Sequence, residues 1–152
     1  MKPESASVAV DRPIREVFDF LAEGRNNPSW RPDVVLAARI SGSGTPLGAG
    51  TTFHQRVTDP HGKVVEEDYE ITRYEPPHVL EFTVTRGLAR MVGRYTLVSI
   101  NSVTTHVEFT MSRISSELRR TVRRDTHSQL HERVEAITRV PAAMKDQGAP
   151  YR

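Results

Sequence analysis

The chain has 152 residues, of which 37% are hydrophobic and 26% charged, and its formal net charge is +2. This length suits one domain with its own core, and the balanced charge gives no reason to expect a nucleic-acid-binding protein. No apolar run approaches the ~20 residues of a membrane span, no apolar signal segment follows the N-terminus, and the absence of cysteine excludes disulfides and thiolate metal sites. We expect a single cytoplasmic domain over residues 1–152, with its core at 5–140.

The N-terminal part of the sequence predicts a strand, a helix and a turn-rich segment. Weak alternation over Ser5–Val10 indicates the strand. Apolar residues then recur at helical spacing from Ile14 to Leu21, which predicts an amphipathic helix ending near Ala22. Residues 25–33 contain two prolines and the only tryptophan, so one short helical turn is the most we expect there.

From Val34 onward the apolar pattern has a period of two, which is typical of strands with one buried face. The expected strands are Val34–Ile40, Thr51–Asp59, Lys63–Glu75, Val79–Thr85, Met91–Ile100 and Val103–Ser112.

The turn between Asp59 and Lys63 sets the register of the clearest hairpin. Pro60 and Gly62 fit a three-residue loop with a type I turn followed by a left-handed glycine. A slip of one residue would bury charged side chains, so the apolar pattern rejects it. The predicted pairs are Phe53–Tyr69, Gln55–Glu67 and Val57–Val65, and across the next turn Ile71–Phe82, Tyr69–Val84 and Glu67–Arg86.

A long helix is expected to follow the last strand. It would begin near Ser115 or Ser116, and Leu118 to Val140 would share one apolar face along it. Pro141 should kink or end this helix, and residues 145–152 should form a frayed tail.

These elements predict an α+β fold in which a curved antiparallel sheet of seven strands is covered by the C-terminal helix. A strongly curled sheet is seldom filled by one amphipathic helix, so we expect a cavity between them.

Several segments resemble one known family. They are Val8–Ala22, Asn27–Val34, Gly50–Phe53, Tyr74–Phe82 and Tyr95–Leu97. With this pattern the chain resembles the START-like superfamily (SRPBCC), whose helix-grip fold is shared with Bet v 1-like proteins, and in particular its bacterial polyketide cyclase/dehydrase-type branch. The resemblance implies a cavity that binds lipids, polyketides, steroids or aromatic molecules. It also implies that the short helical segment forms one lip of the pocket, where Trp30 would either face the ligand or anchor the core.

Glu67 is the most informative polar residue of the predicted pocket. In the expected register it lies on the inward face, opposite Gln55 and Arg86. Desolvation of a carboxylate in such a place is how general acids and bases are tuned. The structural alternative is an ion pair between Glu67 and Arg86 without a role in chemistry.

Tyr69, Tyr95 and Arg133 are further candidates. Each tyrosine is either a core residue whose hydroxyl reaches a hydrogen-bond partner, or a residue that directs its O–H at a ligand carbonyl. Arg133 falls at the centre of the helix's apolar face, so it must reach solvent, pair with a carboxylate or bind an anionic ligand group.

Other residues are expected to line the pocket or lie away from it. Besides Trp30 and Arg133, the expected ligand contacts are Phe53, Gln55, Phe82, Val84, Leu97, Phe109, Val122, Thr126 and Leu130. His127 and His131 have a spacing that can hold a metal, but helical geometry places them opposite the apolar face. We therefore expect no metal and no cofactor.

Three functions are compatible with these residues. The first is the binding of an apolar metabolite such as a polyketide, lipid or aromatic compound, by a monomer or homodimer. The second is a cyclase or dehydratase that uses Glu67, Arg86, Tyr69 and Tyr95 for aldol cyclisation and water loss. The third is a protein-interaction or co-chaperone-like module, whose cavity would be filled by side chains.

Overall fold

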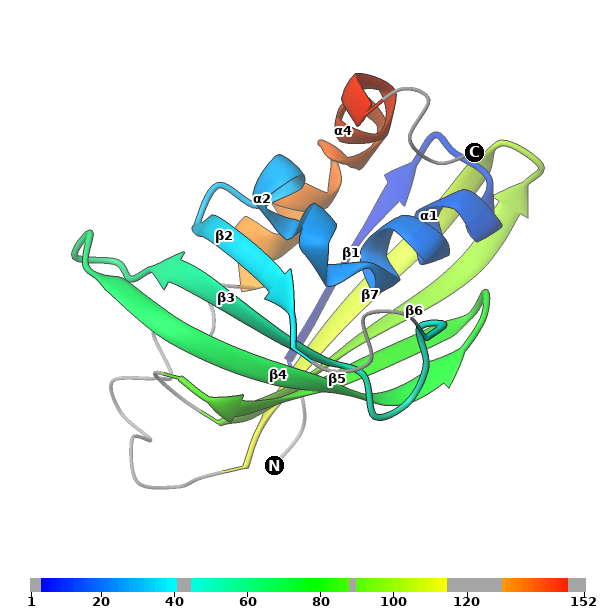
Figure 1. Cartoon of the computed structure of the whole chain (residues 1–152). Helices are drawn as coiled ribbons and strands as arrows, with labels where there is room; N and C mark the ends of the chain where they lie inside the picture. The colour runs from blue at the N-terminus through cyan, green and yellow to red at the C-terminus, as the bar shows by residue number, and fades with distance from the viewer. Residues whose placement is uncertain (1–3, 41–44, 88–89, 115–129, 148–152) are drawn as a thin grey trace.

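The computed structural model describes residues 4–40, 45–87, 90–114 and 130–147 (Figure 1). Its elements are β1 (Glu4–Val10), α1 (Ile14–Ala22), η1 (Gly24–Asn26), α2 (Asn27–Trp30), β2 (Val34–Arg39), β3 (Thr52–Thr58), β4 (Val64–Glu75), β5 (Val79–Arg86), β6 (Met91–Asn101), β7 (Thr104–Arg113) and α4 (Val140–Gln147). Residues 130–137 are also helical. The expected strands and the first helix are confirmed to within a few residues at their ends.

The seven strands form one antiparallel sheet in the order β1-β7-β6-β5-β4-β3-β2. Strands β2 to β7 are neighbours in chain order, and β1 pairs with β7. The sheet curves around α1, α2 and the C-terminal helices, which lie together on its concave side (Figure 1). Register shifts in the β2–β3, β4–β5 and β6–β7 pairs contribute to this curvature, because bulges bend strands. The α+β, helix-grip-like fold class is therefore confirmed.

The first hairpin has the predicted register. Gln55 pairs with Glu67 and Phe53 with Tyr69, and the Asp59 amide donates a hydrogen bond of 2.8 Å to the Lys63 carbonyl. In the second hairpin Tyr69 pairs with Val84, also as predicted.

The predicted pairing of Glu67 with Arg86 is wrong. The register shifts between Asp68 and Tyr69, so that Arg86 lies opposite Asp68 instead. Its Nε donates a hydrogen bond of 2.9 Å to the Asp68 carboxylate, and its side chain is 60% exposed. Because Asp68 faces away from the concave side, the shift carries Arg86 to the outer face with it.

The C-terminal helix is interrupted before Pro141. Residues 130–137 are helical, 138 and 139 form a turn, and α4 starts at Val140 with Pro141 in its first turn. Helix α4 continues through Lys145 to Gln147, the first residues of the segment expected to form a frayed tail. Proline is accommodated in the first turn of a helix because the amide it lacks has no intrahelical acceptor there. No helix within the described ranges is long and apolar enough to cross a membrane.

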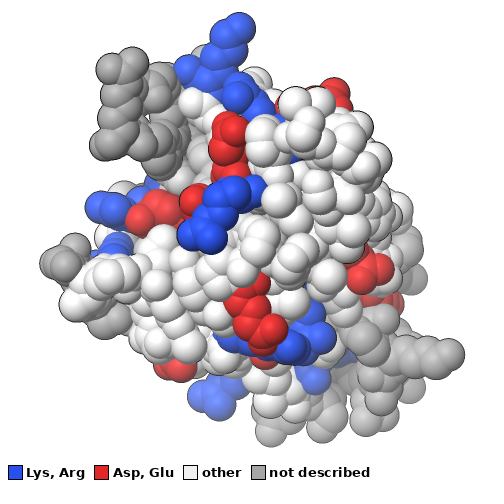
Figure 2. Space-filling view, turned by 90° about the vertical axis from the view of Figure 1, so that its right-hand side faces the viewer, with Lys and Arg blue, Asp and Glu red and all other residues white. Residues whose placement is uncertain are grey.

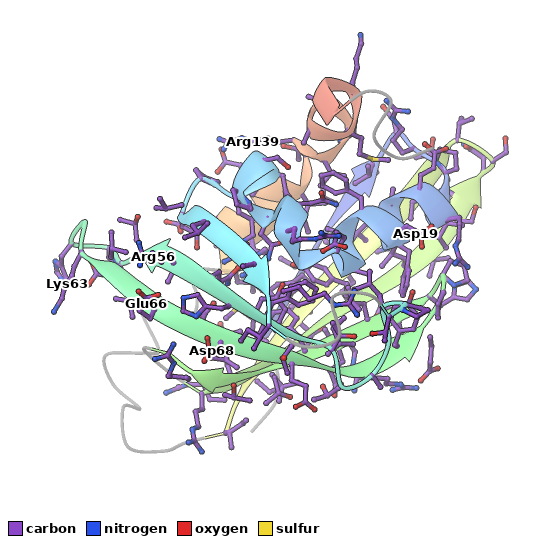
Figure 3. The ribbon with its side chains drawn as sticks, viewed as in Figure 1. Asp19, Arg56, Lys63, Glu66, Asp68 and Arg139 are labelled. Carbon is purple, nitrogen blue, oxygen red and sulfur yellow. The ribbon has the colours of Figure 1, made fainter. Side chains whose placement is uncertain are left out.

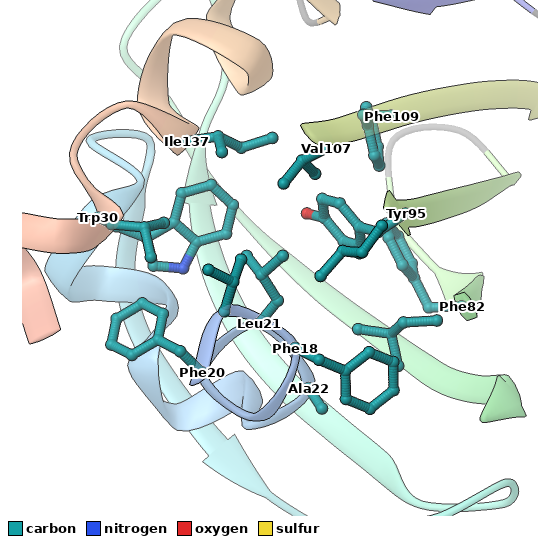
Figure 4. Close-up of a cluster of buried hydrophobic side chains, with 14 of the residues drawn as sticks. Phe18, Phe20, Leu21, Ala22, Trp30, Phe82, Tyr95, Val107, Phe109 and Ile137 are labelled. Atoms are coloured by element: carbon teal, nitrogen blue, oxygen red, sulfur yellow. The ribbon is translucent and has the colours of Figure 1, made fainter. Parts of the chain in front are cut away.

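The core lies between the concave face of the sheet and the helices. From α1, Val17, Phe18 and Leu21 are buried, as the helical spacing predicts. Figure 4 shows Trp30 and Ile137 on the helical side of the cluster, facing Tyr95, Phe82 and Phe109 from the sheet. The largest fully buried side chains include Phe18, Phe53, Phe109, Ile71, Leu97 and Ile137.

The outer face of the sheet carries ion pairs. His54 lies between two carboxylates, with Nε2 at 2.7 Å from Glu66 and Nδ1 at 2.6 Å from Asp68. Arg56 binds Glu66, and these two residues and Asp68 are labelled along the β3–β4 hairpin in Figure 3. Figure 2 shows acidic and basic side chains close to one another on the face in view, without a large region of one sign.

Candidate functional site

A cavity lies between the concave face of the sheet and the segment that runs from α1 to α2. Its volume is ≈ 20 Å³, enough for about one or two water molecules. The described residues that line it are Leu21, Ala22, Asn27, Arg31, Gln55, Tyr69, Ile71, Leu80, Phe82, Tyr95 and Arg133. All of these are buried except Arg133, which is half-buried. An aromatic ligand would therefore have to displace side chains of this wall, and Arg133 is the most exposed of them.

A chain of hydrogen bonds leads to the hydroxyl of Tyr69. The Gln55 amide nitrogen donates to the Glu67 carboxylate at 2.5 Å, so the Gln55 oxygen is left to accept from Asn27 at 3.0 Å. The same Asn27 nitrogen donates to the Tyr69 hydroxyl oxygen at 3.1 Å. Since an ionised carboxylate can only accept, Glu67 fixes the orientation of both amides. The Tyr69 oxygen is thus an acceptor, and its own proton has no acceptor among the described residues.

Tyr95 has a similar arrangement with a charged donor. Arg133 donates from Nη1 to the Tyr95 hydroxyl oxygen at 2.7 Å, and its guanidinium lies 4.8 Å from the Phe109 ring centroid. Cation–π contact with this ring offsets part of the desolvation of the guanidinium. The sequence predicts that Arg133 reaches solvent, pairs with a carboxylate or binds an anionic ligand group. Among the described residues it forms no ion pair with a sheet carboxylate.

Arg31 is a second guanidinium at the cavity, positioned at the C-terminal end of α2. Its side chain is 7% exposed, and Nη2 binds the Asp33 carboxylate at 3.0 Å. Burial acts to lower the pKa of Arg31, but Asp33, Tyr95 and Glu67 raise it above its ordinary value, so the side chain stays charged. Its Nε is buried without a hydrogen-bond partner in the described part of the chain.

Burial also keeps Tyr69 protonated. It raises the pKa of the Tyr69 hydroxyl well above its usual range, and this outweighs the opposing influence of Arg31 and Asn27. The residue therefore offers an O–H group, rather than a phenolate, at any physiological pH.

Gly24 makes room for Tyr69. A Cβ atom at this position would clash with the Tyr69 hydroxyl and lie 2.7 Å from a ring carbon of Phe53. Such contacts are far inside van der Waals distance, so η1 can approach the sheet only with glycine there. The close approach brings Asn27, three residues later, within reach of Gln55 and Tyr69.

Five of the residues predicted to form the site lie together on the cavity wall. They are Gln55, Tyr69, Phe82, Tyr95 and Arg133. The structure places Glu67 behind Gln55 rather than on the wall, and Arg86 on the outer face. The core holds Trp30, Phe53, Val84, Leu97, Phe109 and Leu130, none of which is among the described lining residues. A ligand contact for these residues stays a prediction, and Val122 and Thr126 lie outside the described residues.

Sequence reasoning missed Asn27 and Arg31. Both lie in a segment that the pattern of residues identifies only as turn-rich, and a buried arginine next to a tryptophan has no periodic signal. For the apolar lining residues Leu21, Ile71 and Leu80, the sequence pattern predicts only that they face inward and does not distinguish core positions from cavity lining.

The described residues contain no group of three or more His, Asp or Glu side chains arranged to hold a metal ion. His131 is exposed, and its expected neighbour His127 lies outside the described residues.

Asp33 should make stability depend on pH in the acid range. Burial acts to raise its pKa, but Arg31 and Arg133 lower it below its ordinary value. A lowered pKa contributes stability that is complete above the unfolded value of about 3.9 and is lost as pH falls through the folded value. We expect Asp33→Asn to be less stable than the wild type at pH 7, with a difference that shrinks towards pH 2. Urea unfolding at several pH values measures this.

The control for this experiment is Asp11→Asn, which removes an exposed carboxylate that has no ion pair among the described residues. Parallel pH profiles of Asp33→Asn and the wild type would contradict the expectation.

Residues 5–142 match the family described as polyketide cyclase/dehydrase and lipid transport. No curated protein matches the sequence significantly. Because this family match covers most of the chain, it establishes the family even though single relatives are distant.

Solved structures show the same fold at low sequence identity. A START superfamily protein from Mycobacterium smegmatis has a TM-score of 0.73 and 11% identity, with 90% of this chain and 94% of that chain covered. The Zhui aromatase/cyclase from Streptomyces sp. R1128 has a TM-score of 0.66 and 15% identity, covering 91% and 95%. The di-domain ARO/CYC StfQ from the steffimycin biosynthetic pathway has a TM-score of 0.73 and 17% identity, and the chain spans 46% of its length. The chain belongs to the polyketide cyclase/dehydrase and lipid transport family.

Proposed function

We propose that the protein binds an apolar small molecule that carries a carbonyl or related oxygen atom. The observation behind this proposal is the cavity wall. Apolar side chains such as Leu80 and Phe82 line it together with Tyr69 and Tyr95, each of which carries a hydroxyl group. Each hydroxyl oxygen already accepts a hydrogen bond, from Asn27 or Arg133, and neither O–H has an acceptor among the described residues, so that each can donate to a ligand.

Family membership supports this proposal. The family and its aromatase/cyclase structural neighbours support a ligand-binding or a cyclase role for the chain. Binding sites for such ligands are lined mainly by apolar side chains with a few convergent polar groups, and the described lining residues have that composition.

The proposal is tested with a neutral apolar dye, N-phenyl-1-naphthylamine, whose fluorescence rises in an apolar environment. We expect saturable enhancement with the wild type and its loss in Ala22→Phe, because Ala22 is a buried lining residue and a phenyl group fills the cavity. Ala38→Phe adds the same group at an exposed position of β2 and should leave binding unchanged. Circular dichroism of both variants, compared with the wild type, is the control for folding.

The same experiment separates binding from the protein-interaction function. A volume of ≈ 20 Å³ is also what a cavity filled by side chains would leave. If no dye enters the wild-type protein, the binding proposal is wrong and the interaction function is favoured.

An enzymatic cyclase is the second candidate, and the pairing of Tyr95 with Arg133 favours it. In an aldol step the attacked carbonyl oxygen gains a proton while a carbon atom loses one. Tyr95 can donate to that oxygen with a guanidinium behind it. However, the described lining residues include no carboxylate or imidazole to accept the carbon-bound proton, so binding is the better supported function.

Two variants distinguish enzyme from carrier. An enzyme predicts that Tyr95→Phe and Glu67→Gln abolish turnover of a poly-β-ketone while ligand affinity changes only a few-fold. A carrier predicts changes in affinity alone, and mass spectrometry of a solvent extract of the purified protein should then reveal a bound apolar compound.

A further inference from the structure

The described cavity wall is rich in hydrogen-bond donors that lack an acceptor. Arg31 lines the cavity with a side chain that is 7% exposed, and its buried Nε has no partner among the described residues. Arg133 makes one side-chain hydrogen bond, to Tyr95, and leaves its other donors unused in the described part of the chain. The hydroxyl protons of Tyr69 and Tyr95 add two more donors, since both oxygens accept.

The carboxylates near these groups are held away from the cavity. Asp33 binds Arg31 through Nη2, and Glu67 accepts from Gln55. Neither carboxylate is among the described lining residues, which include two guanidinium groups. Positive charge therefore faces the cavity, and the balancing negative charge lies behind it.

We infer that the ligand carries an anionic oxygen group, such as a carboxylate, next to an aromatic or other apolar body. An ionised carboxylate only accepts hydrogen bonds, so it complements a wall that offers donors, and guanidinium groups match its two oxygens. The inference rests on the binding function proposed above and specifies the chemical class of the ligand.

Arg133 has the larger part in this recognition. It is the half-buried member of an otherwise buried set of described lining residues, so it is the lining residue that solvent reaches most. The Phe82 and Phe109 rings lie 5.9 and 4.8 Å from its guanidinium carbon, which places an apolar surface beside the charge. Arg31 would then contact the anionic group deeper in the cavity, where its Nε lacks an acceptor.

The test is displacement of the neutral dye by two matched compounds, 2-naphthoate and 2-naphthamide, which share shape and differ in charge. A hydrogen bond to a charged group is worth roughly 1.5–3 kcal/mol. Half-displacement of the dye should therefore need a naphthoate concentration at least about 10-fold lower than that of naphthamide. In Arg133→Gln this preference should largely disappear, whereas Arg133→Lys should retain part of it. Arg139→Gln, an exposed arginine near the same helix, is the matched control and should keep the full preference (Figure 3).

The possible outcomes separate this inference from the function on which it rests. Dye binding without preference for naphthoate, or a preference that survives in Arg133→Gln, overturns the inference and leaves the binding function standing. Failure of the dye and both naphthalene compounds to bind overturns both. If Arg133→Gln does not fold, two other measurements test the inference. These are the preference for naphthoate in Arg133→Lys and the salt dependence of dye displacement from the wild type, because an ionic contact must weaken as salt rises.

Discussion

Replacing Phe109 with alanine is expected to lower the free energy of unfolding by about 3–5 kcal/mol. Phe109 is fully buried, and its ring centroid lies 4.7 Å from that of Tyr95 and 6.2 Å from that of Phe82. The substitution leaves a void beneath these rings and removes the aromatic face that Arg133 contacts. Urea unfolding at pH 7 measures the loss.

Two controls make this result specific. Val103→Ala truncates an apolar side chain that is 59% exposed, and it should change stability by no more than about 0.5 kcal/mol. Phe109→Leu keeps most of the volume and should lose less than the alanine variant. A loss below about 1 kcal/mol for Phe109→Ala would contradict the placement of this ring in the centre of the core.

Gln55→Leu is expected to destabilise the protein by about 1–3 kcal/mol although leucine has a similar size and is more apolar. Gln55 is 1% exposed and connects the Glu67 carboxylate to Asn27. Its loss leaves the buried Asn27 with one acceptor fewer and removes this donor from the half-buried Glu67 carboxylate. The neutral dye should also bind with altered affinity, because Asn27 no longer holds the Tyr69 hydroxyl in one orientation.

A double-mutant cycle tests whether these residues act as a chain. If Glu67 acts through Gln55, then Glu67→Gln should cost less stability in the Gln55→Leu background than in the wild type, since the shared hydrogen bond is already absent. Additive effects would show that Glu67 and Gln55 contribute independently, and the chain of hydrogen bonds would then not explain the orientation of Tyr69.

Local pattern was sufficient for the strands and for the first hairpin. Alternation in β3 and β4 marks one face of each strand, and a slip of one residue would bury charges, so the turn at Pro60 and Gly62 leaves one acceptable register. The inward positions of Gln55, Tyr69 and Tyr95 followed from the same rule, as did the buried face of α1.

Alternation fails where a bulge intervenes. The prediction for Arg86 extended a period of two across Asp68 and Tyr69, where the strands shift register and the residue moves to the other face. The position of a bulge depends on how the whole sheet bends around the helices, and the residue types around Asp68 and Tyr69 do not predict one.

The polar lining of the cavity depended on contacts between segments far apart in sequence. Asn27 reaches Gln55 and Tyr69 because Gly24 allows η1 to approach the sheet, and Arg133 reaches Tyr95 across 38 positions of the chain. Sequence periodicity therefore predicted which faces are buried, since burial of a strand or helix face is a local property. Which donors meet in the cavity was decided by tertiary packing, because it brings together Arg31 and Arg133 from segments that have no pattern in common.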